Sequence, residues 1–320
     1  MQGDQAFRAA GSRAHWPEMT YGGALSFLRR RYSRDLAGVD AVVWGVPYDA
    51  SVTYRPGTRL GPRAIRAASV QLAELRAFPF GFDLFEELAI VDYGDAFIDP
   101  HHPETVVPDI ESQAAAILAS GAKLLSLGGD HFTAYPLLRA HAAKYGPLAV
   151  IQVDAHGDLW ADDPGRMDHG TMMVRAIREG LVDPAKSTQV GIRTFHDTTE
   201  GLEVLTAPWL HRNGIGAALD IVRARAAEAP VYLSFDIDGL DPAFAPGTGT
   251  PVPGGLSSAQ ALEFVRGLAG LDLVGMDLVE VSPPFDHAEI TALAAAHLAH
   301  DWLCLLALAA GAEERPVGRL

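Results

Sequence analysis

The chain has 320 residues, of which 48% are hydrophobic and 20% charged, a composition that is ordinary for a soluble globular protein. The formal charge of −15 argues against nucleic-acid binding, because that function needs a basic patch or stripe. No uninterrupted apolar run reaches the roughly 18 residues of a membrane span. The first residues lack the apolar core of a signal peptide, and the single Cys304 cannot form an internal disulfide. We therefore expect a cytoplasmic protein with neither a nucleic-acid nor a membrane partner.

Short apolar runs rich in β-branched residues recur along the chain and predict buried strands. These runs span residues 40–46, 88–94, 123–129, 148–154, 187–193, 231–238 and 273–281. Helical patterns lie between or after them, at residues 103–122, 135–146, 215–229, 257–270 and 288–311. Alternating strands and helices predict an α/β fold, with a mostly parallel sheet covered by helices on both faces.

A parallel sheet can be open or closed into a barrel, and the strand pattern alone does not decide between the two. In both architectures, ligand-binding groups gather at the carboxyl ends of the strands. We expect one catalytic domain over residues 31–311, between an N-terminal arm (1–30) and a C-terminal tail (312–320).

Acids and imidazoles cluster where three of the predicted strands end. VDAHGDLW (153–160) carries the pattern D-x-H-x-D, SFDIDG (234–239) carries D-x-D, and LGGDHF (127–132) brings a histidine directly after a strand. Alternate positions project together from a strand, so the carboxylates would repel one another without a cation between them. We therefore predict a site for two divalent cations. Its ligands are His131, Asp154, His156, Asp158, Asp236 and Asp238.

The ligand types favour Mn²⁺, because carboxylates with a few imidazoles and no cysteine suit hard or borderline ions. Two ions roughly 3.5 to 4 Å apart can share a water and lower its pKa for hydrolysis. A single D-x-D at a strand end is more often a turn or a helix cap, but three such motifs at three strand ends favour metal binding. Three further acids are assigned structural roles. They are Asp130, Asp241, which precedes a proline, and Asp277, which should face away from Glu280 in a regular strand.

Five segments together resemble the signature motifs of the ureohydrolases, the arginase and agmatinase family. They are LGGDHF, VDAHGDLW, MDHGTMM, SFDIDGLDPAFAPGTGTPVPGGLS and GMDLVEVSPPFD. The similarity extends over about four fifths of the chain, from residue 45 to residue 299. It implies an arginase-like three-layer αβα sandwich with a mostly parallel sheet, and a homo-oligomer that is a trimer or hexamer.

The resemblance also implies two ligand sets for Mn²⁺ that share Asp154 and Asp236 as bridging carboxylates. The first set is His131, Asp154, Asp158 and Asp236, and the second is Asp154, His156, Asp236 and Asp238. One departure from the family is Gly157, where threonine or another side chain is common. Because position 157 projects away from the ligands, we expect the glycine to affect a neighbouring contact or the rigidity of the loop rather than metal binding.

Three further residues are predicted to act on the substrate. The resemblance implies that Glu280 binds a guanidinium group, whose paired N–H donors fit a carboxylate, although the residues alone favour a local salt bridge equally. It implies that His169 in MDHGTMM passes a proton to the leaving amine. Thr248 lies in a Gly- and Pro-rich loop suited to the close approach of a ligand. The implied reaction is the hydrolysis of agmatine to putrescine and urea by a hydroxide that bridges the two ions.

Agmatine ends in a second cation, so its site needs an acid or an aromatic residue near the mouth. Trp160, Asp162, Asp163 and Asp168 are close in sequence to the predicted ligands. A ureohydrolase of the guanidinobutyrase or guanidinopropionase type, whose substrates end in an anion, is a second interpretation of the same motifs; arginine fits less well. The motifs also leave open a formimino-group hydrolase and a non-catalytic guanidine- or polyamine-binding protein of the same fold.

Overall fold

The structure of the chain is a computed structural model that describes residues 19–99, 101–163 and 165–315. The predicted N-terminal arm falls largely on residues 1–18, outside this description, as do residues 316–320 of the predicted tail. Phe27 and Leu28, at the end of the predicted arm, are fully buried in the main apolar core.

Nine strands form one sheet in the order β1-β3-β2-β4-β9-β8-β5-β6-β7, and every described strand pairing is parallel. The sheet is therefore open, with β1 and β7 at its edges. The strands are β1 (Arg31–Tyr32), β2 (Ala41–Val46), β3 (Ile90–Asp95), β4 (Lys123–Gly128), β5 (Ala149–Val153), β6 (Thr188–Ile192), β7 (Glu203–Thr206), β8 (Val231–Asp236) and β9 (Leu273–Val279). The central strands are continuous apolar runs because both of their faces are covered.

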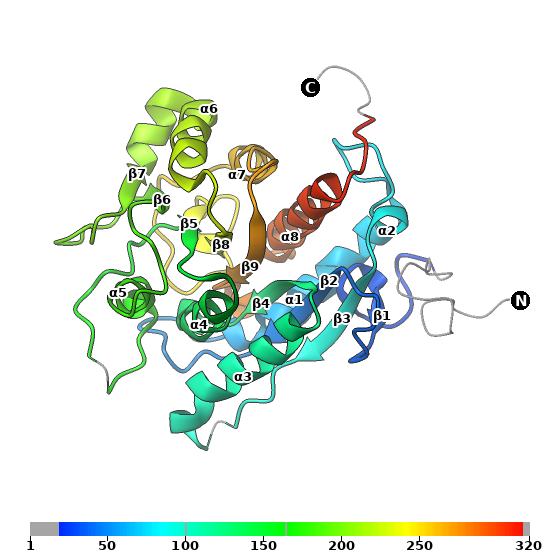
Figure 1. Cartoon of the computed structure of the whole chain (residues 1–320), viewed down its shortest axis with the longest axis horizontal. Coiled ribbons are helices and arrows are strands. Elements are labelled where there is room, and N and C mark those ends of the chain that lie inside the picture. The colour runs from blue at the N-terminus through cyan, green and yellow to red at the C-terminus, as the bar shows by residue number, and fades with distance from the viewer. Residues whose placement is uncertain (1–18, 100, 164, 316–320) are drawn as a thin grey trace, which may run out of the picture.

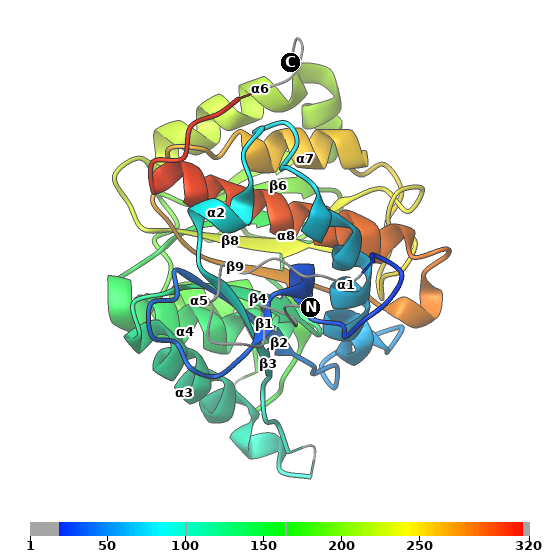
Figure 2. The same cartoon turned by 90° about the vertical axis from the view of Figure 1, so that its right-hand side faces the viewer.

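Helices pack on both faces of the sheet and complete the predicted three-layer αβα architecture (Figures 1 and 2). Helices α3, α4 and α5 contribute to the apolar core of one face, and α1, α6, α7 and α8 contribute to the core of the other. The helices are α1 (Gly61–Ser69), α2 (Leu84–Glu87), α3 (Val106–Ala119), α4 (Ala134–Tyr145), α5 (Met172–Arg178), α6 (Ala207–Ala226), α7 (Ser258–Arg266) and α8 (Ile290–Ala309). The predicted fold class is confirmed.

Helix α8 is long and apolar enough to span a membrane by length and composition, and it is the one described helix of which this is true. However, 72% of its most apolar stretch is buried inside the fold. Trp302, Leu303 and Cys304 lie in the main core with no exposed surface. The apolar sequence of α8 is thus explained by its place in that core.

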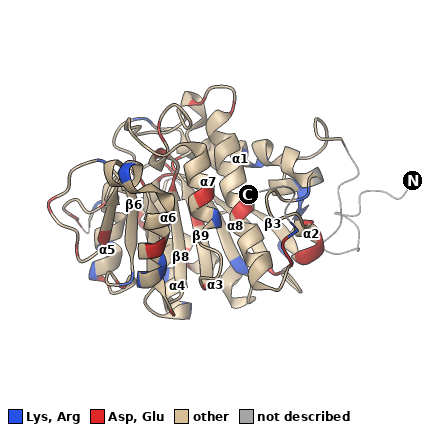
Figure 3. Cartoon of the chain, turned by 90° about the horizontal axis from the view of Figure 1, so that it is seen from above, with Lys and Arg blue, Asp and Glu red and all other residues tan. Residues whose placement is uncertain are grey.

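The parallel arrangement brings the carboxyl ends of β4, β9, β8 and β5 side by side, because these four strands are consecutive neighbours in the sheet. The last residues of these strands and the segments that follow them contain all the predicted metal ligands and Glu280. In the view of Figure 3, lysines and arginines are scattered over separate helices and loops. The fold therefore gathers the predicted site at the carboxyl ends of the central strands.

A buried ion pair joins α1 to β3. The Arg66 guanidinium donates to both carboxylate oxygens of Asp92, over 2.7 and 3.0 Å, and to Asp95 over 2.6 Å. Asp92 is fully buried, whereas the Asp95 side chain is 47% exposed. Removing Asp92 would leave a buried guanidinium without its main partner, which is more costly than losing an exposed partner.

We expect Asp92→Ala to lower the free energy of unfolding by ~3–5 kcal/mol, the typical cost of breaking a buried pair. Asp95→Ala is the matched control and should cost about 1 kcal/mol or less, as exposed pairs do. Urea denaturation of both variants measures the difference. Equal losses of unfolding free energy in the two variants would show that burial of the Arg66–Asp92 pair does not determine its contribution to stability.

Candidate metal centre

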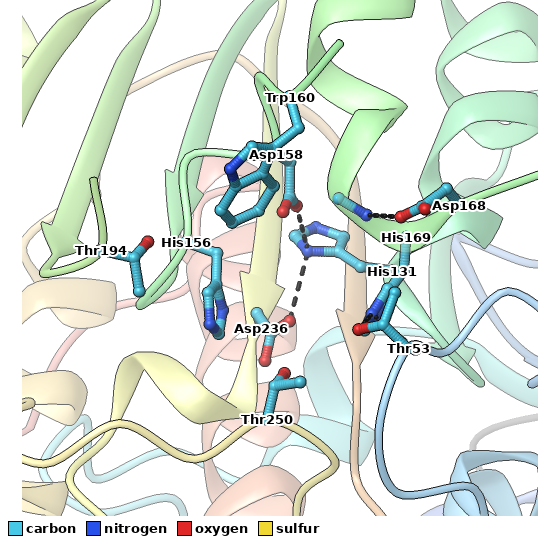
Figure 4. A pocket seen from close by; sticks show the side chains of 11 residues that line it. Thr53, His131, His156, Asp158, Trp160, Asp168, His169, Thr194, Asp236 and Thr250 are labelled. Atoms are coloured by element: carbon cyan, nitrogen blue, oxygen red, sulfur yellow. Dashed lines mark hydrogen bonds and ion pairs between the residues drawn. The ribbon is translucent and has the colours of Figure 1, made fainter. Parts of the chain in front are cut away.

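The six predicted metal ligands lie together at the carboxyl ends of β4, β5 and β8. Figure 4 shows four of them, which are His131, His156, Asp158 and Asp236. Potential ligand atoms of His131, Asp154 and Asp236 lie within 4.8 Å of one another, and so do those of Asp154, His156 and Asp238. The sixth residue, Asp158, has its Oδ2 2.9 Å from Nδ1 of His131. Asp154 is common to both groups, which suits a bridging carboxylate. Asp236 joins the first group alone, so its bridging role stays a prediction.

Turns rather than strand alternation bring these ligands together, which corrects the argument from sequence. Strand β5 ends at Val153, and Asp158 has a left-handed backbone with φ of 50°. The Asp154 carboxylate accepts a hydrogen bond from the His156 amide over 2.6 Å and folds the chain back on itself. In the same way, Asp236 accepts from the amide of Asp238 over 2.8 Å. Each motif is therefore an Asx turn that begins at the strand end.

The imidazole of His131 is oriented toward three carboxylates. Its Nε2 is 2.9 Å from the Ser234 hydroxyl, and that hydroxyl donates to Asp277 over 2.8 Å. Nε2 therefore carries the ring proton, because the hydroxyl proton is engaged by Asp277. Nδ1 makes no hydrogen bond of good geometry, although it lies 3.0 Å from Asp154 and 3.3 Å from Asp236. A lone pair facing buried carboxylate oxygens fits a cation between them.

The titration behaviour of the acids reflects the same crowding. Burial, together with the neighbouring charge of Asp154, raises the pKa of Asp158 to about 6. Burial and the charges of Asp238 and Asp154 raise the pKa of Asp236 well above its usual value. Burial opposes the protonation of His156, but Asp238 and Asp154 outweigh it and raise the pKa of that imidazole to about 12. These residues therefore fit divalent cations, which would neutralise the excess negative charge.

A cavity of about 440 Å³ opens directly onto this cluster (Figure 4). Its lining includes four of the predicted ligands and seven other residues from the surrounding loops. The lining residues are Thr53, His131, His156, Asp158, Trp160, Asp168, His169, Gly170, Thr194, Asp236 and Thr250. The cavity is large enough for a small polar molecule at the metal centre.

Glu280 is fully buried beside the metal centre, directly after β9. Its Oε1 accepts hydrogen bonds from the His131 amide and from Nδ1 of His169, each over 2.8 Å. Its Oε2 is buried and has no hydrogen-bond partner among the described residues. The backbone of Glu280 is left-handed, with φ of 64°, a conformation that is rare for such a residue and is often found at functional sites.

His169 is held between Glu280 and Thr53. Nδ1 donates to Glu280, and Nε2 accepts from the Thr53 amide over 3.1 Å and lies 2.8 Å from its hydroxyl. These contacts place the single ring proton on Nδ1. Burial opposes a second proton, but the Glu280 carboxylate outweighs burial and raises the pKa of His169 to about 9. The ring can therefore gain a second proton at Nε2. Protonated Nε2 could no longer accept the hydrogen bond from the Thr53 amide.

Comparison with known proteins identifies the family. The model of the arginase family matches residues 39–304, and the agmatinase of Chromobacterium violaceum is 59% identical over 306 residues, covering 95% of each chain. The chain belongs to the arginase family. The family resemblance noted in the sequence is thereby confirmed.

Two solved structures of the arginase family are similar to this chain. A hypothetical agmatinase from Burkholderia thailandensis is 57% identical, with a TM-score of 0.94 over 96% of this chain and 98% of that one. Proclavaminate amidino hydrolase from Streptomyces clavuligerus is 39% identical, with a TM-score of 0.86 over 91% of this chain and 99% of that one. The arginase-like form of the three-layer fold is therefore confirmed.

Thr248, for which a substrate contact is predicted, does not line the cavity of this arginase-family protein. It pairs with Val281 in an isolated antiparallel bridge, and its side chain is fully buried. Thr250, two residues later, lines the cavity and donates to Asp238 over 3.2 Å. Thr250 is therefore the threonine of this loop that borders the cavity, and a substrate contact by Thr248 stays a prediction.

The acids considered for the far end of the substrate have different surroundings. Asp162 forms a buried ion pair with Arg175 over 2.6 Å, and Asp163 caps a turn by accepting from the Gly165 amide. Asp168 lines the cavity, as does Trp160, which is 41% exposed. Asp168 is the one carboxylate in the lining that is not a predicted metal ligand.

The departure from the family pattern at Gly157 has a local cause. A Cβ atom at position 157 would lie 2.6 Å from Cδ2 of His196, and real Cβ atoms do not approach other atoms so closely. The imidazole of His196 therefore occupies the space that a side chain at position 157 would fill. This contact lies outside the ligand cluster, as expected from the direction of position 157.

Sequence reasoning missed several polar residues inside the strands, and it assigned Asp277 a structural role, facing away from Glu280, without a partner. Asp277 instead reaches His131 through Ser234. Gln152 and Gln189 were also missed, although Gln152 donates to Asp154 over 2.7 Å. The available signal was a single polar residue in the middle of each apolar strand.

Proposed function

We propose that the protein is a manganese-dependent agmatinase, which hydrolyses agmatine to putrescine and urea. The observation that carries this proposal is the convergence of the six predicted metal ligands beside a cavity that is lined by His169, the hydrogen-bond partner of Glu280. The agmatinase name of the 59% identical relative supports agmatine as the substrate.

The ligand cluster is the proposed site of two Mn²⁺ ions. One ion would be bound by His131, Asp154, Asp158 and Asp236, and the other by Asp154, His156, Asp236 and Asp238. When bound, the two ions supply a water activated for nucleophilic attack. The protein orients the ligands through the contact of His131 with Ser234 and through the Asx turns at Asp154 and Asp236.

Glu280 is proposed to bind the guanidinium group. Its Oε1 is held by the His131 amide and by His169, whereas the buried Oε2 is left to accept an N–H bond from the substrate. A carboxylate hydrogen-bonded to a cation in a buried site forms one of the stronger polar contacts in proteins. The fixed Oε1 means that Oε2 is presented to the substrate without a loss of side-chain freedom.

His169 is proposed to deliver the proton that the departing amine needs when its bond to the guanidinium carbon breaks. The ring is anchored at Nδ1 by Glu280, so Nε2 is the atom that gains and loses the proton. Nε2 lies beside Thr53, another residue of the cavity lining. The same carboxylate would therefore position both the substrate and the acid that acts on it.

Asp168 is proposed to attract the far ammonium group of agmatine, with Trp160 beside it. Oδ1 of Asp168 accepts a hydrogen bond from the Gly170 amide over 3.0 Å. Oδ2 of Asp168 forms an ion pair over 2.7 Å with the exposed side chain of Arg166. A substrate ammonium would compete with this exposed and weakly held arginine for Asp168.

We expect Asp168→Asn to raise KM for agmatine by ~10- to 150-fold, equivalent to ~1.5–3 kcal/mol for a hydrogen bond to a charged group. Asparagine keeps an oxygen that can accept from Gly170, so the change removes mainly the charge. KM for guanidinobutanoate, whose far end is an anion, should rise less. Asp163→Asn is the control, because Asp163 lies in an exposed turn outside the cavity. An unchanged agmatine-to-guanidinobutanoate ratio would place recognition of the amine elsewhere.

The substrate assignment is tested by urea release from agmatine, guanidinobutanoate, guanidinopropanoate and arginine, and by formamide release from formiminoglutamate. Agmatine should give the highest kcat/KM. A higher value for guanidinobutanoate or guanidinopropanoate would reject the agmatinase assignment and retain the ureohydrolase class. Binding of agmatine without turnover by the manganese-loaded protein would instead indicate a non-catalytic binding protein.

We also propose a cytoplasmic homo-oligomer, either a trimer or a hexamer. Each chain would have one catalytic domain over residues 31–311, an N-terminal arm (1–30) and a C-terminal tail (312–320). The family resemblance alone supports the oligomeric state, and size-exclusion chromatography with light scattering would measure it.

A further inference from the structure

Five buried polar side chains form a row across the sheet beneath the metal centre. They occupy equivalent register positions on the adjacent strands β4, β9, β8, β5 and β6. We call this set the transverse polar row, and its members are Ser126, Asp277, Ser234, Gln152 and Gln189. All five are fully buried, where polar groups are unfavourable unless they are hydrogen-bonded.

The row lies next to the ligands along each strand. Gln152 precedes the ligand Asp154 by two residues, and Ser234 precedes the ligand Asp236 by two residues. The row is therefore close enough to contact the ligand side chains from below.

One half of the row fixes two ligand carboxylates. The amide nitrogen of Gln152 donates to Asp154 over 2.7 Å and to Asp158 over 3.2 Å. Carboxylates only accept, so the nitrogen of Gln152 must face them and its oxygen must face the other way. Gln189 holds that oxygen by donating to it over 2.7 Å, and also donates to the Gly157 carbonyl over 2.6 Å. The two glutamines thus orient one oxygen of each ligand.

The other half of the row fixes the ligand imidazole. Ser234 accepts from Nε2 of His131 over 2.9 Å and donates to Asp277 over 2.8 Å. The hydrogen bonds from His131 to Ser234 and from Ser234 to Asp277 therefore determine both the orientation of the imidazole and the position of its proton. The result is that Nδ1 presents its lone pair to the cluster.

Ser126 is the one member of the row that is hydrogen-bonded neither to a ligand nor to another member of the row. It lies beside Asp277 on the opposite side from Ser234, in the same register row. Its hydroxyl has no hydrogen-bond partner among the described residues. Ser126 and Ser234 are thus two buried serines that flank the same aspartate and differ in their contact with a ligand.

We propose that the transverse polar row positions the metal ligands and thereby sets the metal affinity of the site. The inference rests on the proposed metal site, because it assigns a role to residues that touch ligands rather than metal. Fixing the ligand side chains before a cation arrives lowers the conformational freedom that binding must remove. Partners of this kind typically change metal affinity by ~10- to 100-fold.

The test compares Ser234→Ala and Gln152→Met with Ser126→Ala. Mn²⁺ binding to each metal-free protein is followed by the loss of the electron paramagnetic resonance signal of free Mn²⁺. We expect the dissociation constant to rise ~10- to 100-fold for Ser234→Ala and for Gln152→Met. Ser126→Ala should bind Mn²⁺ as the unmodified protein does. Gln189→Met, which touches no ligand side chain, should weaken binding less than Gln152→Met.

Melting temperatures of the metal-free variants separate positioning from folding. Ser234→Ala should weaken Mn²⁺ binding even where its metal-free melting temperature matches that of Ser126→Ala. The proposal is overturned if Ser234→Ala and Gln152→Met bind Mn²⁺ normally, or if Ser126→Ala weakens binding equally. Should Gln152→Met fail to fold, the two serine variants decide the outcome. An unmodified protein that binds no Mn²⁺ would overturn the proposed metal site as well, so the two failures are distinguishable.

Discussion

Replacement of Asp154 by alanine is expected to abolish measurable turnover and to release both metal ions. Asp154 belongs to both groups of potential ligand atoms, whereas Asp158 belongs to neither and contacts one other predicted ligand, His131. The loss of a residue shared by two ions should therefore lower metal affinity and activity by more than the ~10- to 100-fold that is typical when a residue that only supports a ligand is removed. Asp158→Ala should lose one ion preferentially and keep some activity.

Elemental analysis of Mn²⁺ per chain and kcat/KM for agmatine measure both effects. The unmodified protein should hold two ions per chain, and Asp163→Ala, a change in an exposed turn, should leave the metal content and activity unaltered. Equal residual activity in Asp154→Ala and Asp158→Ala would contradict the bridging role of Asp154. A fully active protein with one tightly bound ion would contradict the two-ion site itself.

Replacement of His169 by alanine is expected to lower kcat by ~10²- to 10⁴-fold, the usual contribution of a general acid or base. The metal content should stay normal, because the ring contacts Glu280 and Thr53 rather than the ligand carboxylates. Steady-state kinetics and elemental analysis on the same preparation test both parts of this expectation.

His211→Ala is a suitable control for the His169 variant, since His211 is exposed and bonded to the Gly254 carbonyl. It should keep normal kcat and normal metal content. If His169→Ala instead loses metal in proportion to activity, His169 supports the cluster rather than transferring a proton.

Most of the sheet was predictable because its central strands are buried on both faces and therefore continuously apolar. All seven predicted strands are present, with ends shifted by two residues or fewer. The missed strands, β1 and β7, are short edge strands of two and four residues that carry little pattern. Helix α6 begins eight residues before its predicted start. Gly214 interrupts the helix with φ of 82°, which hides the helical periodicity of the residues before it.

The metal centre was predictable as a set of residues but not as a geometry. The motifs identified the six predicted ligands that the fold brings together, yet the Asx turn at Asp154 and the left-handed backbone of Asp158 leave no simple signature in the sequence. The partner of His131 was equally hidden, because Ser234 lies 103 residues away along the chain. Such contacts depend on strand order, and alternation of helices and strands does not specify that order.

The close approach of His196 to Gly157 links two loops that are distant in sequence. A threonine at position 157 would have to displace the His196 ring, whose Nδ1 lies 2.5 Å from the Thr198 carbonyl oxygen. That shift would disturb the loop after β6, which brings Thr194 to the cavity wall. Positions 157 and 196 are therefore a size-matched pair, in which a larger side chain at position 157 calls for a smaller one at position 196.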